Sequence, residues 1–286
     1  MDRVERKGGE CRTGDVTACY ERLTTQLRSL ADTPLLLFGY ASLLWNPDVV
    51  YTSATPACVA GFHRRLWQAS PDHRGTPSAM GRVATLLPAC AGRWRARVAG
   101  GVTCSELEGR ALRAWLNRCE GGDGGGSGGA ASTAVELEEA EEGGELPVVH
   151  GTVYALEKEC ARAMLEKLCV RERAGYELLG VRLALEGDVV EADAFTFSGA
   201  TGVGFGAGFF APSSSAEVAR VVASASGSSG PNLVYFAELL KAMRARNVVD
   251  RHLEEVWGLL LSENRGAVWA LLGDEAASRL EKRPVA

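Results

Sequence analysis

The chain has 286 residues, of which 46% are hydrophobic and 23% charged, and its net charge is −5. This composition is ordinary for a globular protein, and the length is sufficient to bury a core. An acidic chain lacks the basic surface of a nucleic-acid-binding protein, so we expect no nucleic-acid partner. No apolar run reaches the length of a membrane span, and residues 1–30 lack a signal-peptide core. We therefore expect no membrane association and a cytoplasmic location.

The eight cysteines lie far apart, at positions 11, 19, 58, 90, 104, 119, 160 and 169. Without a secretory signal, this spacing is typical of reduced thiols rather than of disulfides. The sequence contains no Cys-x-x-Cys motif and no tight His/Cys cluster, so it indicates no zinc site.

Residues 1–33 are polar and charged, and we expect a flexible N-terminal extension with one short helix near Cys19–Leu30. The apolar run Leu35–Phe38 then predicts a buried strand that ends in a loop. The small residues within Gly39–Ser42 allow backbone N–H groups to approach a ligand closely. Such a row of amides suits a carboxylate or a developing oxyanion, although an ordinary turn explains the same pattern.

Three segments follow this loop before the composition changes. Val59–Gly61 and Phe62–Ala69 are typical of strand, and so is Gly81–Leu87. Between them, Ser70–Pro77 is polar and bounded by Pro and Gly, which predicts a loop.

The segment from about 89 to 147 has a different composition. Gly121–Gly129 is dominated by glycine, Glu136–Glu145 is acidic, and no Lys or Arg occurs between Arg118 and Lys158. Such a sequence cannot bury enough apolar surface to offset the cost of ordering its backbone. We therefore expect a flexible insertion, with one short helix near Leu107–Leu116, inside a single domain.

A strand at Val148–Ala155 and a helix from Glu157 are predicted next. Apolar residues recur at steps of four, at Leu156, Cys160, Met164 and Leu168. The next step is Glu172, so a continuing helix would direct this carboxylate toward the interior. Burial and the helix C-terminus both raise the pKa of a carboxyl group, which makes it a better base near neutral pH. The alternative is that Arg171–Arg173 is a solvated helix end.

The C-terminal part begins with two strands, Glu177–Leu185 and Val189–Phe197, which predict a hairpin. Gly199–Gly208 is rich in glycine, but no Gly-Lys-Ser/Thr follows, so it is not a phosphate-binding loop.

Two helices are predicted at the end of the chain. Asn232 is a candidate N-cap for a helix with apolar residues at Leu233, Phe236, Leu240 and Met243. A last core helix is expected at about Asp250–Leu261, and residues 263–286 are expected to form a tail with some helical content.

Several short blocks resemble, in order, motifs of the ChaC family of γ-glutamylcyclotransferases, which act on glutathione. The first block is similar to F-G-Y-G-S-L-I-W, the fifth to R-E-K-x-G-Y and the last to S-G-x-N-x-x-Y-L. The blocks are Phe38–Pro47, Arg64–Pro77, Gly81–Leu86, Gly151–Tyr154, Arg171–Tyr176 and Ser229–Phe236. They extend over residues 35–262 and are interrupted by the insertion.

The resemblance implies an α+β fold in which a small mixed β-barrel is flanked by helices, formed by residues 34–262. It implies that the Tyr-x-Ser-Leu loop lies at one end of the barrel. It also implies cytosolic cleavage of glutathione to 5-oxoproline and cysteinylglycine, with no metal or organic cofactor. The sequence identifies no protein partner.

The resemblance also implies roles for individual residues. In this reaction the α-amine of the γ-glutamyl group attacks its own γ-carbonyl carbon, so a base must first deprotonate the ammonium. Glu172 is the candidate base, and Tyr176 is expected to orient it or to contact the substrate. The expected binding groups for the substrate α-carboxylate or the oxyanion are the backbone amides of Tyr40, Ala41, Ser42 and Leu43.

A cationic group is expected to receive the glycine carboxylate of glutathione. Its candidates are Arg65, Arg74 and Arg82, while His73 is a candidate for either turn packing or catalysis. Strand-edge arginines are usually solvated, which is the alternative for all three.

Two positions depart from the family pattern. Ala41 stands where the motif has Gly, and a requirement for positive φ there would cost about 1 kcal/mol. Ala163 stands where glutathione-degrading members carry a second Glu. Two alternatives to the glutathione enzyme follow, namely a cyclotransferase for other γ-glutamyl amines or dipeptides, and a weakly catalytic regulatory module whose acidic insertion faces a partner.

Overall fold

The computed structural model describes residues 35–88, 96–97, 103–104, 147–172, 176–185, 191–201, 204–205 and 213–281. The helices expected near Cys19–Leu30 and Leu107–Leu116 lie outside the described residues, as does most of the 89–147 insertion.

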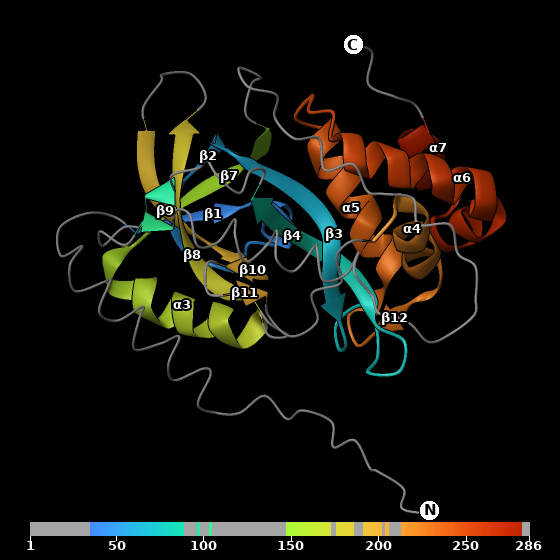
Figure 1. The fold of residues 1–286 in the computed structure, drawn as a ribbon, viewed down its shortest axis with the longest axis horizontal. Helices are drawn as coiled ribbons and strands as arrows, with labels where there is room; N and C mark the ends of the chain where they lie inside the picture. Colours follow the sequence, from blue (N-terminus) through green and yellow to red (C-terminus); the bar gives the residue numbers. More distant parts are fainter. Residues whose placement is uncertain are drawn as a thin grey trace, which may run out of the picture.

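Five strands form a closed barrel in the order β1-β7-β2-β8-β9 (Figure 1). Their bounds are Leu35–Gly39 for β1, Tyr51–Ala60 for β2, Val148–Leu156 for β7, Glu177–Leu185 for β8 and Glu191–Ser198 for β9. Neighbouring strands are antiparallel except β1 and β9, which are parallel where the barrel closes. The helix α3, Lys158–Arg171, packs on the barrel through Leu168, which contributes to a cluster with Leu37 and Phe195. The predicted mixed barrel is therefore confirmed.

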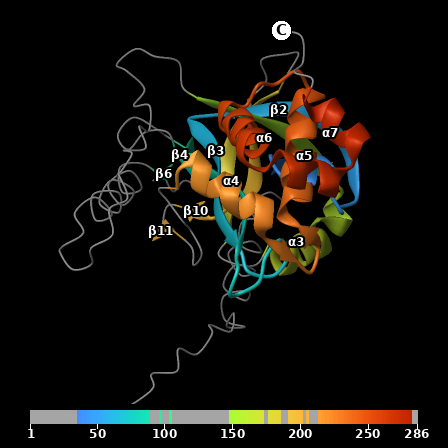
Figure 2. The ribbon, with the colours of Figure 1, turned by 90° about the vertical axis from the view of Figure 1, so that its right-hand side faces the viewer.

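A long antiparallel hairpin connects the barrel to a helical layer. It consists of β3, Phe62–Ser70, and β4, Gly81–Pro88, and it crosses between the barrel and the helices in Figure 1. The helices are α4, Ser215–Ser224, α5, Asn232–Arg244, α6, Arg251–Leu272, and α7, Asp274–Glu281, and they lie on one side of the hairpin (Figure 2). One continuous apolar cluster joins barrel, hairpin and helices, so the three layers share a core.

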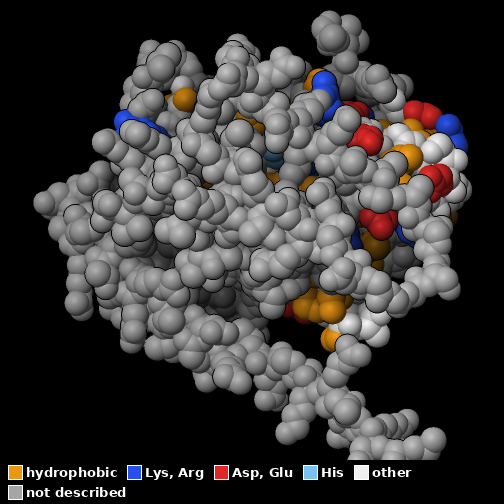
Figure 3. All heavy atoms as spheres, in the orientation of Figure 1, with side chains coloured by type: hydrophobic (Ala, Val, Ile, Leu, Met, Phe, Trp, Pro, Cys, Tyr) orange, Lys and Arg blue, Asp and Glu red, His pale blue; other side chains and the backbone are white. Residues whose placement is uncertain are grey.

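The remaining elements are short. They are the 3-10 turn η1, Ser42–Leu44, and the paired strands β5, Ala96–Arg97, with β6, Thr103–Cys104; β10, Ala200–Thr201, with β11, Gly204–Phe205; and β12, Ser226–Gly227, with β13, Gly230–Pro231. The outer surface of the helical layer carries acidic and basic side chains among apolar ones (Figure 3). None of the described helices has both the length and the apolarity to cross a membrane.

The structure differs from the sequence predictions at β2, at Gly61 and at α4. The strand β2 begins at Tyr51, well before the expected Val59. Its first residues are exposed and form no apolar run, so the sequence pattern predicted only the end of the strand. Gly61, expected as strand, is the turn between β2 and β3, with φ of 83°. The helix α4 was not predicted, although it begins with a capping box formed by Ser214 and Glu217.

The last core helix extends past the predicted Leu261. α6 continues to Leu272 across a break at Asn264, and α7 follows directly. Val268, Ala277 and Leu280 are buried in this region. Residues expected to form a tail therefore contribute to the core as far as Glu281.

Asn232 does not cap α5, because the N-cap position is Pro231 and no side chain caps the helix there. Its fully buried amide instead pairs with the backbone of Arg82 at the start of β4. The Asn232 Oδ1 accepts the Arg82 N–H at 2.6 Å, and Nδ2 donates to the Arg82 carbonyl at 2.8 Å. This pair joins the beginning of α5 to the hairpin.

We expect Asn232→Ala to lower the free energy of unfolding by about 2–4 kcal/mol. The substitution leaves two backbone groups of Arg82 without their partners, and each costs about 1–3 kcal/mol. Urea denaturation measures the change, with the exposed Ser262→Ala as the control. A loss below about 0.5 kcal/mol, the level of an ordinary surface change, would contradict this role for the amide.

Candidate active site

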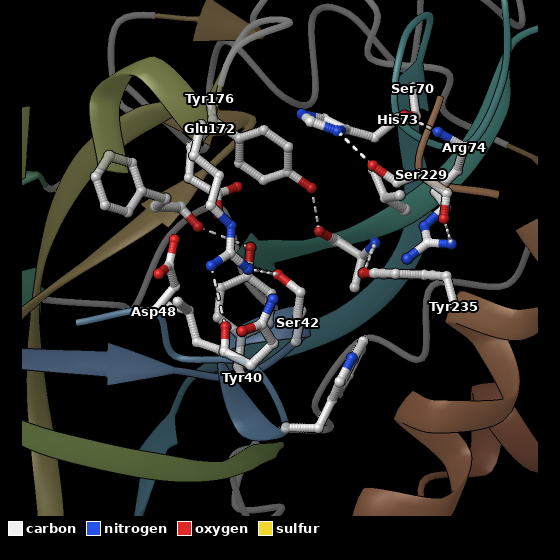
Figure 4. A pocket seen from close by; sticks show the side chains of 18 of the residues that line it. Tyr40, Ser42, Asp48, Ser70, His73, Arg74, Glu172, Tyr176, Ser229 and Tyr235 are labelled. Carbon is white, nitrogen blue, oxygen red and sulfur yellow. Dashed lines mark hydrogen bonds and ion pairs between the residues drawn. The ribbon is translucent and has the colours of Figure 1, made fainter. Parts of the chain in front are cut away.

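A pocket of about 350 Å³ lies between the end of the barrel, the β3–β4 hairpin and the start of α5. This volume suits a small molecule. Figure 4 shows its side chains converging from separate parts of the chain, with Glu172 and Tyr176 on one side and Arg74, Ser229 and Tyr235 on the other. The sequence-predicted residues that line it are Tyr40, Ala41, Ser42, Leu43, His73, Arg74, Glu172 and Tyr176.

The loop after β1 lines this pocket with Tyr40, Ala41, Ser42 and Leu43. The N–H groups of Leu44 and Asn46 are bound to the carbonyls of Ala41 and Ser42, at 2.8 and 2.9 Å. By contrast, within the described part of the chain the N–H groups of Ala41, Ser42 and Leu43 have no hydrogen-bond acceptor. Amides arranged in this way are suited to binding an anionic oxygen.

Ala41 has φ of −137°. The loop therefore does not require the left-handed conformation at this position, and Ala in place of Gly carries no such cost here.

Two carbonyls of the loop are held by side chains behind it. The Arg64 Nε donates to the Tyr40 carbonyl at 3.0 Å, and the Tyr154 hydroxyl donates to the Leu43 carbonyl at 2.6 Å. Arg64 is itself 2% exposed and bound to Asp250 and to the His150 carbonyl. Neither Arg64 nor Tyr154 was a candidate from the sequence, because their partners are distant along the chain.

Glu172 lies at the end of α3 and faces the pocket. The helix ends at Arg171, and Glu172 is its C-cap residue, with its N–H bound to the Leu168 carbonyl at 2.7 Å. Its side chain is 17% exposed. The inward orientation predicted from the steps of four is therefore present, although the helix stops one residue earlier. Burial raises the pKa of Glu172 above its usual value of 4.5, while Arg171 and His73 oppose that rise.

Arg171 joins this carboxylate to the loop and was missed as a site residue. Its Nη2 donates to the Ser42 Oγ at 2.8 Å, and its Nη1 donates to the Asn46 carbonyl at 3.0 Å. Its Nε lies 3.4 Å from the Glu172 Oε1. The available signal was its position beside Glu172, where the sequence equally allowed a solvated helix end.

We expect Arg171→Gln to move the acidic limb of the kcat/KM profile to higher pH. Arg171 lowers the pKa of Glu172, so its removal leaves burial less opposed and the carboxyl loses its proton at a higher pH. The measurement is the pH dependence of the activity that the resemblance implies, release of 5-oxoproline from glutathione. Lys241→Gln, at an exposed site on α5, is the matched loss of one positive charge. An unmoved acidic limb would show that Arg171 does not act on the Glu172 carboxyl.

The expected arginine group is only partly assembled. Arg74 lines the pocket, where its Nη1 donates to the Ser229 carbonyl at 2.5 Å and its guanidinium lies 5.7 Å from the Tyr235 ring centroid. Arg65 lines a different pocket and donates to the Arg64 carbonyl at 3.0 Å. Arg82 is near Glu217 of α4, which opposes the lowering of its pKa by burial. Neither Arg65 nor Arg82 lines the pocket that contains Arg74.

Other lining residues were not predicted, and Tyr235 and Ser229 are the main ones. Both lie in the last resemblance block, which was the signal that could have found them. The Ser229 hydroxyl is 2.9 Å from Nδ1 of His73, a candidate whose side chain is 48% exposed. Ala163 is exposed on α3 and does not line this pocket. Among the residues that the structure describes, no group of His, Cys, Asp or Glu is arranged to hold a metal ion.

The sequence of this chain is similar to a known protein family and to several named proteins. The family model described as ChaC-like protein matches residues 35–262. A Saccharomyces cerevisiae protein named glutathione-specific gamma-glutamylcyclotransferase is 31% identical over 225 residues, which cover 72% of this chain and 84% of that protein. A human protein named glutathione-specific gamma-glutamylcyclotransferase 1 is 47% identical over 53 residues, or 18% of this chain and 24% of that one.

The fold agrees with a solved relative. A crystal structure of the yeast gamma-glutamyl cyclotransferase specific to glutathione superimposes with a TM-score of 0.57 at 26% identity. The match covers 80% of this chain and 99% of the yeast chain. The family model matches most of the chain, and the yeast relative is matched over 84% of its length. This chain therefore belongs to the ChaC-like family.

Proposed function

We propose that this chain is a γ-glutamylcyclotransferase that cleaves glutathione to 5-oxoproline and cysteinylglycine. The observation that carries the proposal is one pocket that is lined both by the partly buried carboxylate of Glu172 and by a loop whose backbone amides have no acceptors among the described residues. The yeast and human relatives, whose names specify glutathione, support the choice of substrate. A cytoplasmic site of action remains a prediction.

The reaction is an intramolecular acyl transfer. Glu172 takes a proton from the α-ammonium of the γ-glutamyl group, which frees the lone pair of the nitrogen. That nitrogen bonds to the γ-carbonyl carbon and closes a five-membered ring, while the carbonyl oxygen becomes an oxyanion. The oxyanion then reforms the carbonyl, the bond to the cysteinylglycine nitrogen breaks, and Glu172 returns its proton to this leaving nitrogen. The ring nitrogen still carries two hydrogens, and it gives one of them to the free Glu172 carboxylate, which passes it to the product amine or to solvent. Because both reacting groups belong to one substrate molecule, the pocket has to hold the γ-glutamyl group in a folded conformation and to transfer protons.

The loop amides of residues 40–43 bind the anionic groups of the γ-glutamyl end. Their candidates are the α-carboxylate and the developing oxyanion, and the Ser42 hydroxyl, held by Arg171, adds a further polar contact. Tyr176 lies beside Glu172, where it orients the base or contacts the substrate (Figure 4). Arg74 lies across the pocket from Glu172 and is the candidate for the glycine carboxylate.

The proposal is tested by offering the purified protein glutathione, γ-glutamylcysteine, other γ-glutamyl dipeptides and γ-glutamyl amines, and by measuring 5-oxoproline. We expect kcat/KM for glutathione to exceed the others by at least about tenfold, since the shorter substrates lose contacts in the pocket. N-acetylglutathione, whose nitrogen cannot attack, is the negative control.

Two results would redirect the assignment. Equal turnover of dipeptides or amines would make the protein a general γ-glutamylcyclotransferase with the same base and loop. No 5-oxoproline from any substrate would contradict the enzyme and favour a regulatory module.

A further inference from the structure

Three tyrosines line the pocket, and their hydroxyl groups are bound differently. The Tyr40 hydroxyl donates to the Phe197 carbonyl at 2.7 Å, and the Tyr176 hydroxyl donates to the Ala84 carbonyl. The Tyr235 oxygen instead accepts a hydrogen bond from the Ala84 N–H, at 3.0 Å. Within the described residues, the proton of the Tyr235 hydroxyl has no acceptor.

The bond from Ala84 fixes where this proton can point. A phenol oxygen accepts through its lone pairs, so its own hydrogen turns away from the N–H that it accepts. Ala84 is 1% exposed and belongs to β4, which forms the wall behind the hydroxyl. Tyr235 and Ala84 both line the cavity, and Figure 4 shows the tyrosine beside it. The cavity is therefore where an acceptor for the proton would sit.

Tyr235 also stays protonated at neutral pH. Burial is the main cause that raises the pKa of Tyr235 to about 12, against the smaller lowering effects of the Ala84 bond, Arg64 and Arg74. The residue is 5% exposed, so its hydroxyl acts in a site with little competing water.

We propose that Tyr235 donates a hydrogen bond to the γ-carbonyl oxygen as that oxygen becomes an oxyanion, an inference that rests on the proposed function. When the amine nitrogen bonds to the γ-carbon, the π electrons of the carbonyl move to oxygen, and the Tyr235 O–H stabilises this charge without transferring its proton. When the carbonyl reforms, the leaving nitrogen takes its proton from Glu172. This role leaves the loop amides to the α-carboxylate.

The first test is Tyr235→Phe, assayed with glutathione. Loss of one oxyanion donor is expected to reduce kcat about 10²–10³-fold, with KM changed by less than about threefold, because the bond strengthens only in the transition state. A kcat within about threefold of wild type would overturn the role of Tyr235. If the wild-type protein itself releases no 5-oxoproline, the proposed function fails instead, so the two failures are distinguishable.

A second variant separates oxyanion stabilisation from support of Ala84, and it decides the matter if the Phe variant does not fold. Tetrafluorotyrosine at position 235 keeps the oxygen but lowers the pKa of the phenol by several units. If catalysis requires the hydroxyl as a donor, kcat of this variant falls at alkaline pH, because the ionised fluorophenol has no proton to donate. A hydroxyl that only accepts from Ala84 accepts better when ionised, so an unchanged alkaline limb would overturn the proposal.

Discussion

Glu172→Gln is expected to lower kcat for glutathione by about 10³-fold or more, at the upper part of the range for general acid–base groups. The amide has nearly the size of the carboxylate but cannot take a proton from the α-ammonium. The other acidic and imidazole side chains that line the pocket are much more exposed than Glu172: Asp48 is paired with Lys167, and His73 and Asp72 are about half exposed. The measurement is steady-state release of 5-oxoproline.

The matched control is Glu159→Gln, an exposed carboxylate on the same helix, which is expected to keep wild-type turnover. A Glu172→Gln variant with kcat within tenfold of wild type would refute the assignment of Glu172 as the general base.

The same substitution has a predictable effect on stability. The pKa of Glu172 is raised in the folded state, so its buried charge disfavours folding above the folded pKa and has no effect below the usual value of 4.5. Glu172→Gln is therefore expected to be at least as stable as wild type at pH 7, and the two proteins should converge as the pH falls below 4.5. Urea denaturation at both pH values checks this and shows that lost activity is not lost folding.

Arg64→Met is expected to lower the free energy of unfolding by about 3–5 kcal/mol, the cost of removing one partner of a buried ion pair. The Arg64 side chain is 1% exposed and lies 2.6 Å from the Asp250 carboxylate, whose side chain is 15% exposed. Methionine leaves that carboxylate and the carbonyls of Tyr40 and His150 without their cationic donor. Urea denaturation measures the loss, with Arg220→Met, exposed on α4, as the control expected to change stability by less than about 0.5 kcal/mol.

Arg64→Met should also weaken catalysis where the protein remains folded. The Tyr40 carbonyl loses the donor that holds it behind the loop, so the amides of the loop are no longer held in one orientation. We expect kcat to fall at temperatures well below the unfolding transition. Wild-type stability and turnover in this variant would contradict both roles of Arg64.

Local patterns were sufficient for the parts of the site that lie within one element. The apolar run before Gly39 predicted β1, and the small residues after it predicted the loop that lines the pocket. The steps of four along α3 predicted the inward orientation of Glu172, because helical periodicity depends only on neighbouring residues. The family resemblance then gave the barrel that brings the loop and the helix end together.

Contacts between distant elements could not be read from such patterns. Arg64 and Asp250 are separated by 186 positions, and Ala84 and Tyr235 by 151, so nothing local links them. Arg65 and Arg82 had the same residue type as Arg74 and also lay in the blocks of resemblance, but only Arg74 lines the pocket, and Arg65 lines a different one. Asn232 was predicted to be an N-cap because asparagine favours that position. In the structure its side-chain amide instead forms hydrogen bonds with the backbone of Arg82 in β4.

The most direct test of cyclisation in this pocket is the product balance from glutathione. The purified protein is incubated with glutathione, and 5-oxoproline, cysteinylglycine and free glutamate are quantified together. Attack by the substrate's own amine predicts equal amounts of 5-oxoproline and cysteinylglycine with no glutamate, because no water enters the reaction. Release of glutamate with cysteinylglycine would show attack by water instead and would contradict the intramolecular acyl transfer.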